Sequence, residues 1–301
     1  HHAPRHRIIM RVLNRSLHTR PHMTTINPQA PVLVTGASGY IAGWLITYLL
    51  EGGYTVHGTV RDPNKPKGLE HLAKLQARFP NKLILFKADL LTDGAYDEAM
   101  TGCELVMHTA SPFVMSGFAD AHEALVRPAV EGTRNVLESA NRVSSVKRIV
   151  LTSSVASVYG DNIDAQTVPN GIFNESHWNT SSSVTHQPYS YSKVMAERAA
   201  WDIQKQQSRW DLVTINPGFV LGPSLARNSQ STSIDTMKQL GDGTMRMGAP
   251  PFEMGVVDVR DIATAHIKAG FTPSAEGRYI IVARSMSVLQ MGQALRAHFG
   301  N

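Results

Sequence analysis

The sequence predicts an α/β protein with a Rossmann-type doubly wound parallel sheet and a smaller C-terminal substrate lobe. Two observations predict this class. From Pro31 onward, short apolar runs alternate with longer segments of helical periodicity, which is the signature of βαβ units. The first apolar run ends in a turn from Gly36 to Gly39, directly before a helical segment, and such turns bind phosphate groups in this fold.

The alternation extends over six predicted strands. The chain has 301 residues, of which 42% are hydrophobic and 18% charged, as expected for a large folded unit. Most runs are continuously apolar, which is typical of strands covered on both faces. The predicted strands are Val32–Thr35, Tyr54–Val60, Leu83–Lys87, Leu105–Thr109, Arg148–Ser153 and Leu212–Asn216. The predicted helices are Ile41–Glu51, Leu69–Arg78, Ala95–Met100, Ala119–Asn141 and Tyr189–Gln207, and a long loop is expected from Asp161 to Gln187.

The first glycine turn has the features of a dinucleotide site. Gly36 permits a tight turn, and Gly39 lets the backbone approach a pyrophosphate. The helix that starts near Ile41 presents free N–H groups and the positive end of its dipole. Ser38 and Tyr40 lie in the same turn, so all five residues are predicted to bind the cofactor.

The second strand ends in Arg61, where a cofactor without a 2′-phosphate would favour a carboxylate. A guanidinium instead offers a fork of donors to a phosphate, so the sequence favours NADP(H). Lys65 and Lys67 lie just beyond and would assist. Asp62 opposes this interpretation unless its side chain turns away.

The third strand runs into Asp89 and Leu90. A carboxylate at this point would accept a hydrogen bond from the adenine amino group. A structural role for Asp89 as a helix cap fits the residue type equally well.

Tyr189 and Lys193 stand at positions i and i+4, on one face of a predicted helix. An ammonium near a phenol favours the phenolate, so the phenol becomes a usable proton donor and acceptor near neutrality. The fifth strand ends in Ser153 and Ser154, at the sheet edge where ligands of such folds bind. A serine hydroxyl there would polarise a carbonyl, and we select Ser154. These groups suit a small-molecule carbonyl whose carbon receives hydride from a nicotinamide.

Together these motifs resemble the extended short-chain dehydrogenase/reductase family, in the branch of dihydroflavonol, cinnamoyl-CoA and yeast-type aldehyde (methylglyoxal) reductases. The resemblance covers about Pro31 to Phe299. It rests on Val34–Ala42, Thr59–Asp62, Lys87–Leu90, His108–Phe113, Glu131–Leu137, Thr152–Ser154, Tyr189-x-x-x-Lys193 and Asn216–Gly218.

The resemblance implies an NADPH-dependent reductase that converts an aldehyde or ketone to the alcohol, with Tyr189 as general acid. Ser154 would contact the same carbonyl, and Lys193 would hold the nicotinamide ribose. The other implied cofactor contacts are Arg61 and Lys67 to the 2′-phosphate, Asp89 and Leu90 to the adenine, and Thr109, Ala110, Ser111, Pro217 to Val220, and Ser233 along the rest of the cofactor.

Four positions depart from the family pattern. Ala129 stands where many members have a catalytic asparagine, so a proton relay must differ. Gln187 and Pro188 replace the Asn-Trp pair typical of cinnamoyl-CoA reductases, and Tyr159 replaces an asparagine near the flavonoid ring of dihydroflavonol reductases. These departures weaken the case for a CoA thioester and for a flavonoid.

Two alternative functions stay open. Ser157 to Asp161 also resembles the nucleotide-sugar epimerase/dehydratase branch of the family. A non-catalytic NADP-sensing protein is the other alternative, although such proteins usually lose the tyrosine or the lysine, and both are present here. The sequence does not name the substrate or the oligomeric state.

The domain expectation is an extension over residues 1–30, an NADP-binding domain over 31–217 and a substrate lobe over 218–301 that is incomplete at its C-terminus. The boundary follows Pro217 because the regular alternation loosens there. The extension is predicted to be disordered: residues 1–50 contain no Asp or Glu, and five arginines precede Met23. A transit peptide, translated upstream sequence and a cloning remnant all fit this composition.

Composition also bounds compartment and partners. Cys103 is the single cysteine, so no internal disulfide is available and a cytoplasmic location is expected, with organellar targeting left open by the extension. The net charge is +5, but many basic residues lie in the extension, so neither a nucleic-acid nor a membrane partner is expected. The longest apolar run, Gly39–Leu50, is well short of the ~20 residues needed to span a bilayer, and no zinc motif is present.

Overall fold

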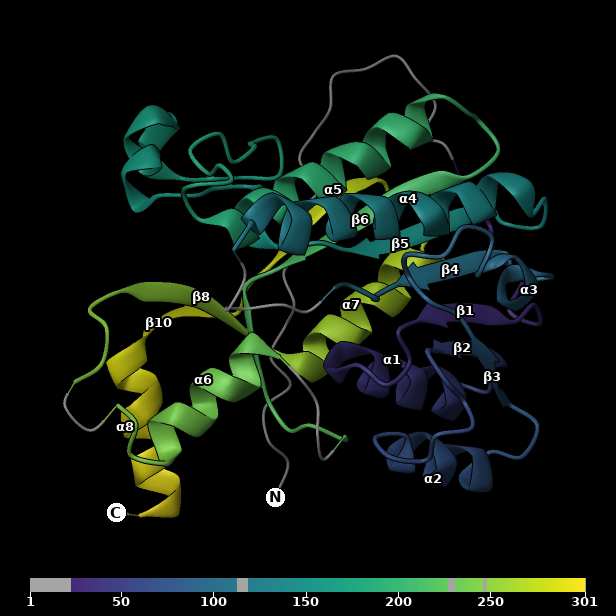
Figure 1. Cartoon of the computed structure of the whole chain (residues 1–301), viewed down its shortest axis with the longest axis horizontal. Helices are drawn as coiled ribbons and strands as arrows, with labels where there is room; N and C mark the ends of the chain where they lie inside the picture. The colour runs from purple at the N-terminus through teal and green to yellow at the C-terminus, as the bar shows by residue number, and fades with distance from the viewer. Residues whose placement is uncertain (1–22, 113–118, 227–230, 246–247, 301) are drawn as a thin grey trace.

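The predicted α/β class is confirmed in the computed structural model, which describes residues 23–112, 119–226, 231–245 and 248–300 (Figure 1). A seven-stranded sheet has the order β3-β2-β1-β4-β5-β6-β9, and every neighbouring pair is parallel. Its strands are β1 (Val32–Thr35), β2 (Val56–Val60), β3 (Leu83–Lys87), β4 (Leu105–His108), β5 (Arg148–Thr152), β6 (Asp211–Pro217) and β9 (Gly277–Ile281). The order reverses direction beside β1, which places β1 and β4 at the topological switch point of the sheet.

Helices cover both faces of this sheet (Figure 1). Helices α4 (Arg127–Arg142) and α5 (Pro188–Lys205) lie on one face, and α1 (Tyr40–Glu51), α2 (Glu70–Arg78) and α7 (Val259–Phe271) lie on the other. The short α3 (Asp97–Met100) follows β3. Because strand side chains alternate, Leu33 and Val106 belong to the core under α4 and α5, whereas their neighbours Val34 and Met107 belong to the core under α1 and α7.

The six predicted strands are all present with small differences at their ends. The helix expected over Ala119–Asn141 differs more, because it begins with a π-helical turn, η1 (His122–Val126). Pro128 follows that turn and has no N–H to donate to the preceding turn, so the regular α pattern starts only at Arg127. Strand β9 was not predicted, since it is a short edge strand whose residues are mostly only half-buried.

Residues 23–30 differ from the expected disordered extension. Thr24 and Ile26 are buried, the Thr24 N–H donates to Pro273 O at 3.1 Å, and the Asn27 N–H donates to Glu104 Oε2 at 2.7 Å. The segment therefore packs against the end of the sheet at which the parallel strands begin, opposite their carboxyl ends. The disorder predicted for residues 1–22 concerns a segment that lies outside the described residues.

A second, smaller lobe lies beside the sheet (Figure 1). It contains a three-stranded sheet of order β10-β8-β7 with helices α6 (Thr232–Gly241) and α8 (Val288–Phe299). Its strands are β7 (Phe219–Leu221), β8 (Glu253–Asp258) and β10 (Arg284–Ser287). The region after residue 217 is not confined to this lobe, because β9 pairs with β6 and α7 packs on α1.

The connection between β5 and α5 is the long loop that the sequence predicts. It contains three short 3₁₀ turns, η2 (Val155–Ser157), η3 (Asn162–Thr167) and η4 (Pro169–Gly171). Within the described ranges, every helix is too short or too polar to cross a bilayer.

Candidate active site

The predicted phosphate turn has the required geometry. Gly36 has φ +67°, and a Cβ at this position would lie 3.0 Å from Ala110 Cα, so only glycine fits. The Gly39 N–H donates to Gly36 O at 2.8 Å and closes the turn. Gly39 has no side chain to cap α1, so the first N–H groups of the helix stay available to an anion. Ser38 is exposed in this turn and Ile41 is half-buried in the first turn of α1.

Thr35 joins this turn to the end of β4. Its Oγ1 accepts from the N–H groups of Thr109 and Ala110, both at 3.1 Å, and lies 2.8 Å from His108 Nδ1. Burial, and then the positive charge of Lys193, lower the pKa of His108 to about 3, so this imidazole is neutral. The predicted segment from Thr109 to Ser111 is thus fixed beside the glycine turn.

The end of β2 leaves two cations exposed. Asp62 is occupied within its own turn, because Oδ1 accepts from the Asn64 N–H at 3.0 Å and Oδ2 lies 3.6 Å from Lys65 Nζ. Arg61 and Lys67 are exposed and have no ion pair within the described residues. The Asp62 carboxylate, which would repel a phosphate, is therefore engaged by its own turn and not by Arg61 or Lys67.

Asp89 and Leu90 follow β3 at the same edge. Asp89 Oδ1 accepts from the Leu91 N–H at 2.9 Å within a turn and caps no helix, because α3 begins only at Asp97. Leu90 is held by α4: its carbonyl accepts from Asn135 Nδ2 at 3.0 Å, and a Cβ on Gly132 would lie 2.5 Å from Leu90 Cγ. An adenine contact by these two residues stays a prediction.

Lys193 links α5 to the loop that follows β4. Its Nζ donates to Ser111 Oγ at 2.9 Å and lies 5.5 Å from the centroid of the Tyr189 ring. Tyr189 is 44% exposed, so its phenol is open to a substrate. A pocket at this edge is lined by Leu90, Ala110, Ser111, Pro112, Ala129, Thr133, Leu151, Thr152, Ser153, Lys193, Ala196 and Glu197.

The start of α5 is fixed from the long loop. Gln187, directly before Pro188, has φ +53°, a left-handed conformation that is unfavourable for a residue before proline. Asp161 compensates, since its Oδ1 accepts from Gln187 Nε2 at 2.6 Å and its Oδ2 lies 2.8 Å from His186 Nε2. This contact holds the turn that presents Tyr189.

The structure separates the two candidate serines. Ser153 is 7% exposed, and its Oγ donates to Glu197 Oε2 at 2.5 Å. Ser154 is half-buried, and its Oγ accepts only a 3.1 Å bond from the Ala156 N–H among the described residues, so its proton is free to point outward. This geometry supports the choice of Ser154 over Ser153.

Three of the other predicted cofactor residues meet between the two lobes. Tyr40, Val220 and Ser233 line a cavity of about 290 Å³. Tyr40 Oη donates to Gly222 O at 2.7 Å, which ties the loop after β7 to the N-terminus of α1. Pro217 is buried at the end of β6, where the chain leaves the large sheet for this lobe.

Two charged residues under the site were not singled out from the sequence. Glu197 on α5 and Arg278 on β9 form a buried ion pair with a distance of 2.6 Å between Arg278 Nε and Glu197 Oε1. The spacing offered one signal, because Glu197 stands four residues after Lys193 and thus shares its helix face. No sequence pattern indicated Arg278, whose strand lies beyond the regular alternation.

Residues 32–282 match the NAD dependent epimerase/dehydratase family. The chain belongs to this family. The resemblance to extended short-chain dehydrogenase/reductases is thereby confirmed, and two similar proteins are named as reductases. A cinnamoyl-CoA reductase of Medicago truncatula is 42% identical over 277 residues, which are 91% of this chain and 82% of the relative. Tetraketide alpha-pyrone reductase 1 of Arabidopsis thaliana is 40% identical over 89% of this chain and 81% of its own length.

Solved structures give the same assignment. The yeast methylglyoxal/isovaleraldehyde reductase, in complex with NADPH, has a TM-score of 0.78 and 28% identity over 90% of this chain and 84% of its own. A UDP-glucose-4-epimerase from Stenotrophomonas maltophila has a TM-score of 0.71 over 90% of this chain and 84% of its own, but at 16% identity it shows the fold alone. This family member is therefore a nicotinamide-dependent oxidoreductase, as the sequence predicted.

Proposed function

We propose that this protein is an NADPH-dependent reductase that converts an aldehyde or ketone to the alcohol, with Tyr189 as the general acid. The observation that supports this most directly is the position of Lys193. Its Nζ contacts the Ser111 hydroxyl of the cofactor loop at 2.9 Å and lies 5.5 Å from the Tyr189 ring centroid. One ammonium is thus placed to serve both the nicotinamide ribose and the acid.

The residues present fit a dinucleotide. The turn from Gly36 to Gly39 and the uncapped start of α1 suit its pyrophosphate, and Thr35 fixes the loop beside it. Bound NADPH supplies the hydride for the carbonyl carbon. Arg61 and Lys67 would hold the 2′-phosphate, because both are exposed while Asp62 is engaged by its own turn.

The reaction then requires three protein groups. Ser154 donates a hydrogen bond to the carbonyl oxygen and stabilises the negative charge that develops there. Tyr189 transfers its proton to that oxygen. Lys193 favours the resulting phenolate, and solvent returns a proton to the exposed phenol after the alcohol leaves.

The substrate class follows from the relatives more than from the pocket. Relatives at 40% and 42% identity are named as reductases of a pyrone and of a CoA thioester, whereas the epimerase is 16% identical. Reduction is therefore favoured over epimerisation. The presence of both Tyr189 and Lys193, with the Lys193 Nζ 5.5 Å from the Tyr189 ring centroid, favours an enzyme over an NADP sensor. Tyr159, which the sequence resemblance places where dihydroflavonol reductases have an asparagine, stacks on Phe173 with ring centroids 5.2 Å apart.

The test is NADPH absorbance with purified protein and a set of aldehydes, diketones, a cinnamoyl-CoA thioester, a flavanonol and a nucleotide sugar. Tyr189→Phe should lower turnover of the best substrate by roughly 10²–10⁴-fold while NADPH still binds. Tyr191→Phe is the matched control, because Tyr191 projects from another side of the helix. Loss of activity in Tyr191→Phe with near-normal activity in Tyr189→Phe would refute the assignment of the acid.

A further inference from the structure

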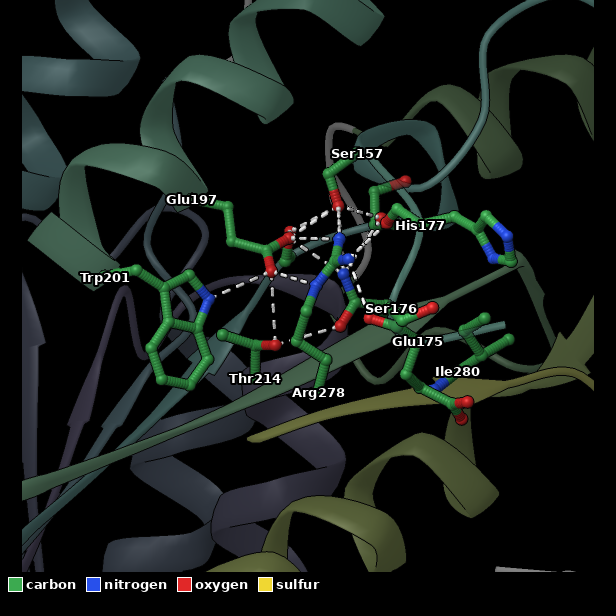
Figure 2. Close-up of polar contacts among 12 residues, drawn as sticks. Ser157, Glu175, Ser176, His177, Glu197, Trp201, Thr214, Arg278 and Ile280 are labelled. Atoms are coloured by element: carbon green, nitrogen blue, oxygen red, sulfur yellow. Dashed lines mark hydrogen bonds and ion pairs between the residues drawn. The ribbon is translucent and has the colours of Figure 1, made fainter. Parts of the chain in front are cut away.

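A buried carboxylate lies on the same side of α5 as Tyr189 and Lys193. Glu197 is 1% exposed and follows Tyr189 and Lys193 at four-residue intervals along α5, so the three share one side of the helix. Figure 2 shows Glu197 surrounded by donors from several elements. These are Ser153 Oγ at 2.5 Å, Ser157 Oγ at 2.5 Å, Arg278 Nε at 2.6 Å, Asn216 Nδ2 at 2.9 Å, Trp201 Nε1 at 3.2 Å and Thr214 Oγ1 at 3.3 Å.

Arg278 satisfies this charge from β9. Its side chain is 7% exposed, and it donates to the carbonyl oxygens of Glu175 at 3.0 Å and His177 at 2.5 Å as well as to Glu197 (Figure 2). Its guanidinium also lies 4.0 Å from the Trp178 ring centroid. The pair therefore joins α5, β9 and the long loop after β5.

The same carboxylate holds Ser153 and Ser157, which lie before and after Ser154 in the chain. Ser153 donates to it directly. Ser157 Oγ lies 2.5 Å from Glu197 Oε2 and 2.7 Å from Ser154 O, and its single proton serves one of the two at a time. Asn216 Nδ2, which donates to Glu197, also lies 3.2 Å from Ser154 O. The backbone of Ser154 is thus tied on both sides to the helix that bears Tyr189 and Lys193.

We propose that Glu197 and Arg278 are positioning residues for the reduction, and that the pair fixes the Ser154 hydroxyl relative to Tyr189 and Lys193. The inference rests on the proposed reductase function. A buried ion pair adds little stability compared with apolar residues of similar size, because desolvation offsets the attraction between the charges. Such a network instead holds the Ser154 and Tyr189 hydroxyls in fixed positions around one carbonyl oxygen. A displacement of about 1 Å in a group of this kind can lower the rate about 100-fold.

A positioning role and a purely structural role predict different results for a double variant. Glu197→Gln leaves the Arg278 charge without its counter-ion and replaces one of the two carboxylate oxygens with an NH2 group, so the remaining oxygen cannot accept from both the serines and Arg278. In Glu197→Gln/Arg278→Met the buried charges are removed together, so the melting temperature should recover toward that of the unmodified protein. If the pair positions Ser154, kcat stays low in the double variant. If the pair only stabilises the fold, kcat recovers with the melting temperature.

The experiment measures kcat, KM and NADPH affinity, together with amide hydrogen exchange over residues 152–158, in the full chain. For Glu197→Gln we expect kcat to fall about 10- to 100-fold, NADPH affinity to change less than about threefold, and exchange over 152–158 to become faster. Glu51→Gln is the matched control, because Glu51 pairs with Arg78 at 3.0 Å on the surface of the molecule. It should leave all of these values unchanged.

The outcomes separate this inference from the proposed function. An unmodified protein that reduces no carbonyl refutes the proposed function, and the exchange rates then decide the inference by themselves. Unchanged exchange over 152–158 in both Glu197 variants refutes it in that case. With an active protein, a kcat within twofold of normal in Glu197→Gln, or recovery of kcat in the double variant, refutes it.

Discussion

Ser153 and Ser154 are adjacent, yet the structure predicts opposite effects for their removal. In Ser154→Ala the hydroxyl that would donate to the carbonyl oxygen is lost, and one donor of this kind is worth about 10²–10³ in kcat, or roughly 2.7–4 kcal/mol. The stability cost is smaller. Ser154 Oγ accepts only the Ala156 N–H within the described residues, so its loss should cost about 1 kcal/mol, as for other N-cap positions.

Ser153→Ala should do the reverse. Its hydroxyl donates at 2.5 Å to the buried Glu197 carboxylate, and hydrogen bonds to charged groups contribute roughly 1.5–3 kcal/mol. Ser157, Asn216 and Arg278 still hold that carboxylate, so kcat should stay within about fivefold of normal.

The assay pairs kcat at saturating substrate and NADPH with thermal unfolding of the same preparations. Ser154→Ala should be the less active and the more stable of the two variants. The reasoning is refuted if Ser153→Ala loses more turnover than Ser154→Ala, because Ser153 would then be the residue that contacts the carbonyl.

Three further predictions concern cofactor choice, stability and pH. Arg61→Asp should reverse or abolish the preference for NADPH over NADH, because a carboxylate repels the 2′-phosphate and accepts from a 2′-hydroxyl; equal use of both cofactors by the unmodified protein would contradict this. Arg148→Met should lower the free energy of unfolding by about 3–5 kcal/mol, since Arg148 is fully buried and forms two bonds of 2.7 and 2.9 Å to Asp211. Arg142→Met, which breaks a similar two-bond pair with an exposed aspartate, should cost less than about 1 kcal/mol, and equal losses would show that burial is not the deciding factor. Burial raises the pKa of Glu197, but the charge of Arg278 and the hydrogen bonds outweigh it and hold that pKa below its ordinary value of 4.5. The stability that Glu197 contributes is thus complete above pH 4.5 and is lost as the pH falls further, so the difference in melting temperature between unmodified protein and Glu197→Gln should narrow below that pH.

The sequence by itself determined the fold class, six of the seven strands of the large sheet and the residue types of the site. These features depend on short-range patterns: continuous apolar runs, a glycine turn between a strand and a helix, and a Tyr–Lys pair one helical turn apart. Because parallel strands place their carboxyl ends at one edge of the sheet, the motifs after β1, β2, β3, β4 and β5 had to converge once that topology formed.

The tertiary structure alone decided which hydroxyls and charges are free. Ser153 and Ser154 are adjacent in sequence, and only the tertiary structure shows that the Ser153 hydroxyl is engaged by Glu197 whereas the Ser154 hydroxyl is not. Asp62 turns toward its own loop, which no pattern of charges indicated. Arg278 reaches Glu197 across 81 residues of chain, from an edge strand without a strong signal of its own. Such contacts join segments that are distant in sequence, so they depend on packing geometry and not on local periodicity.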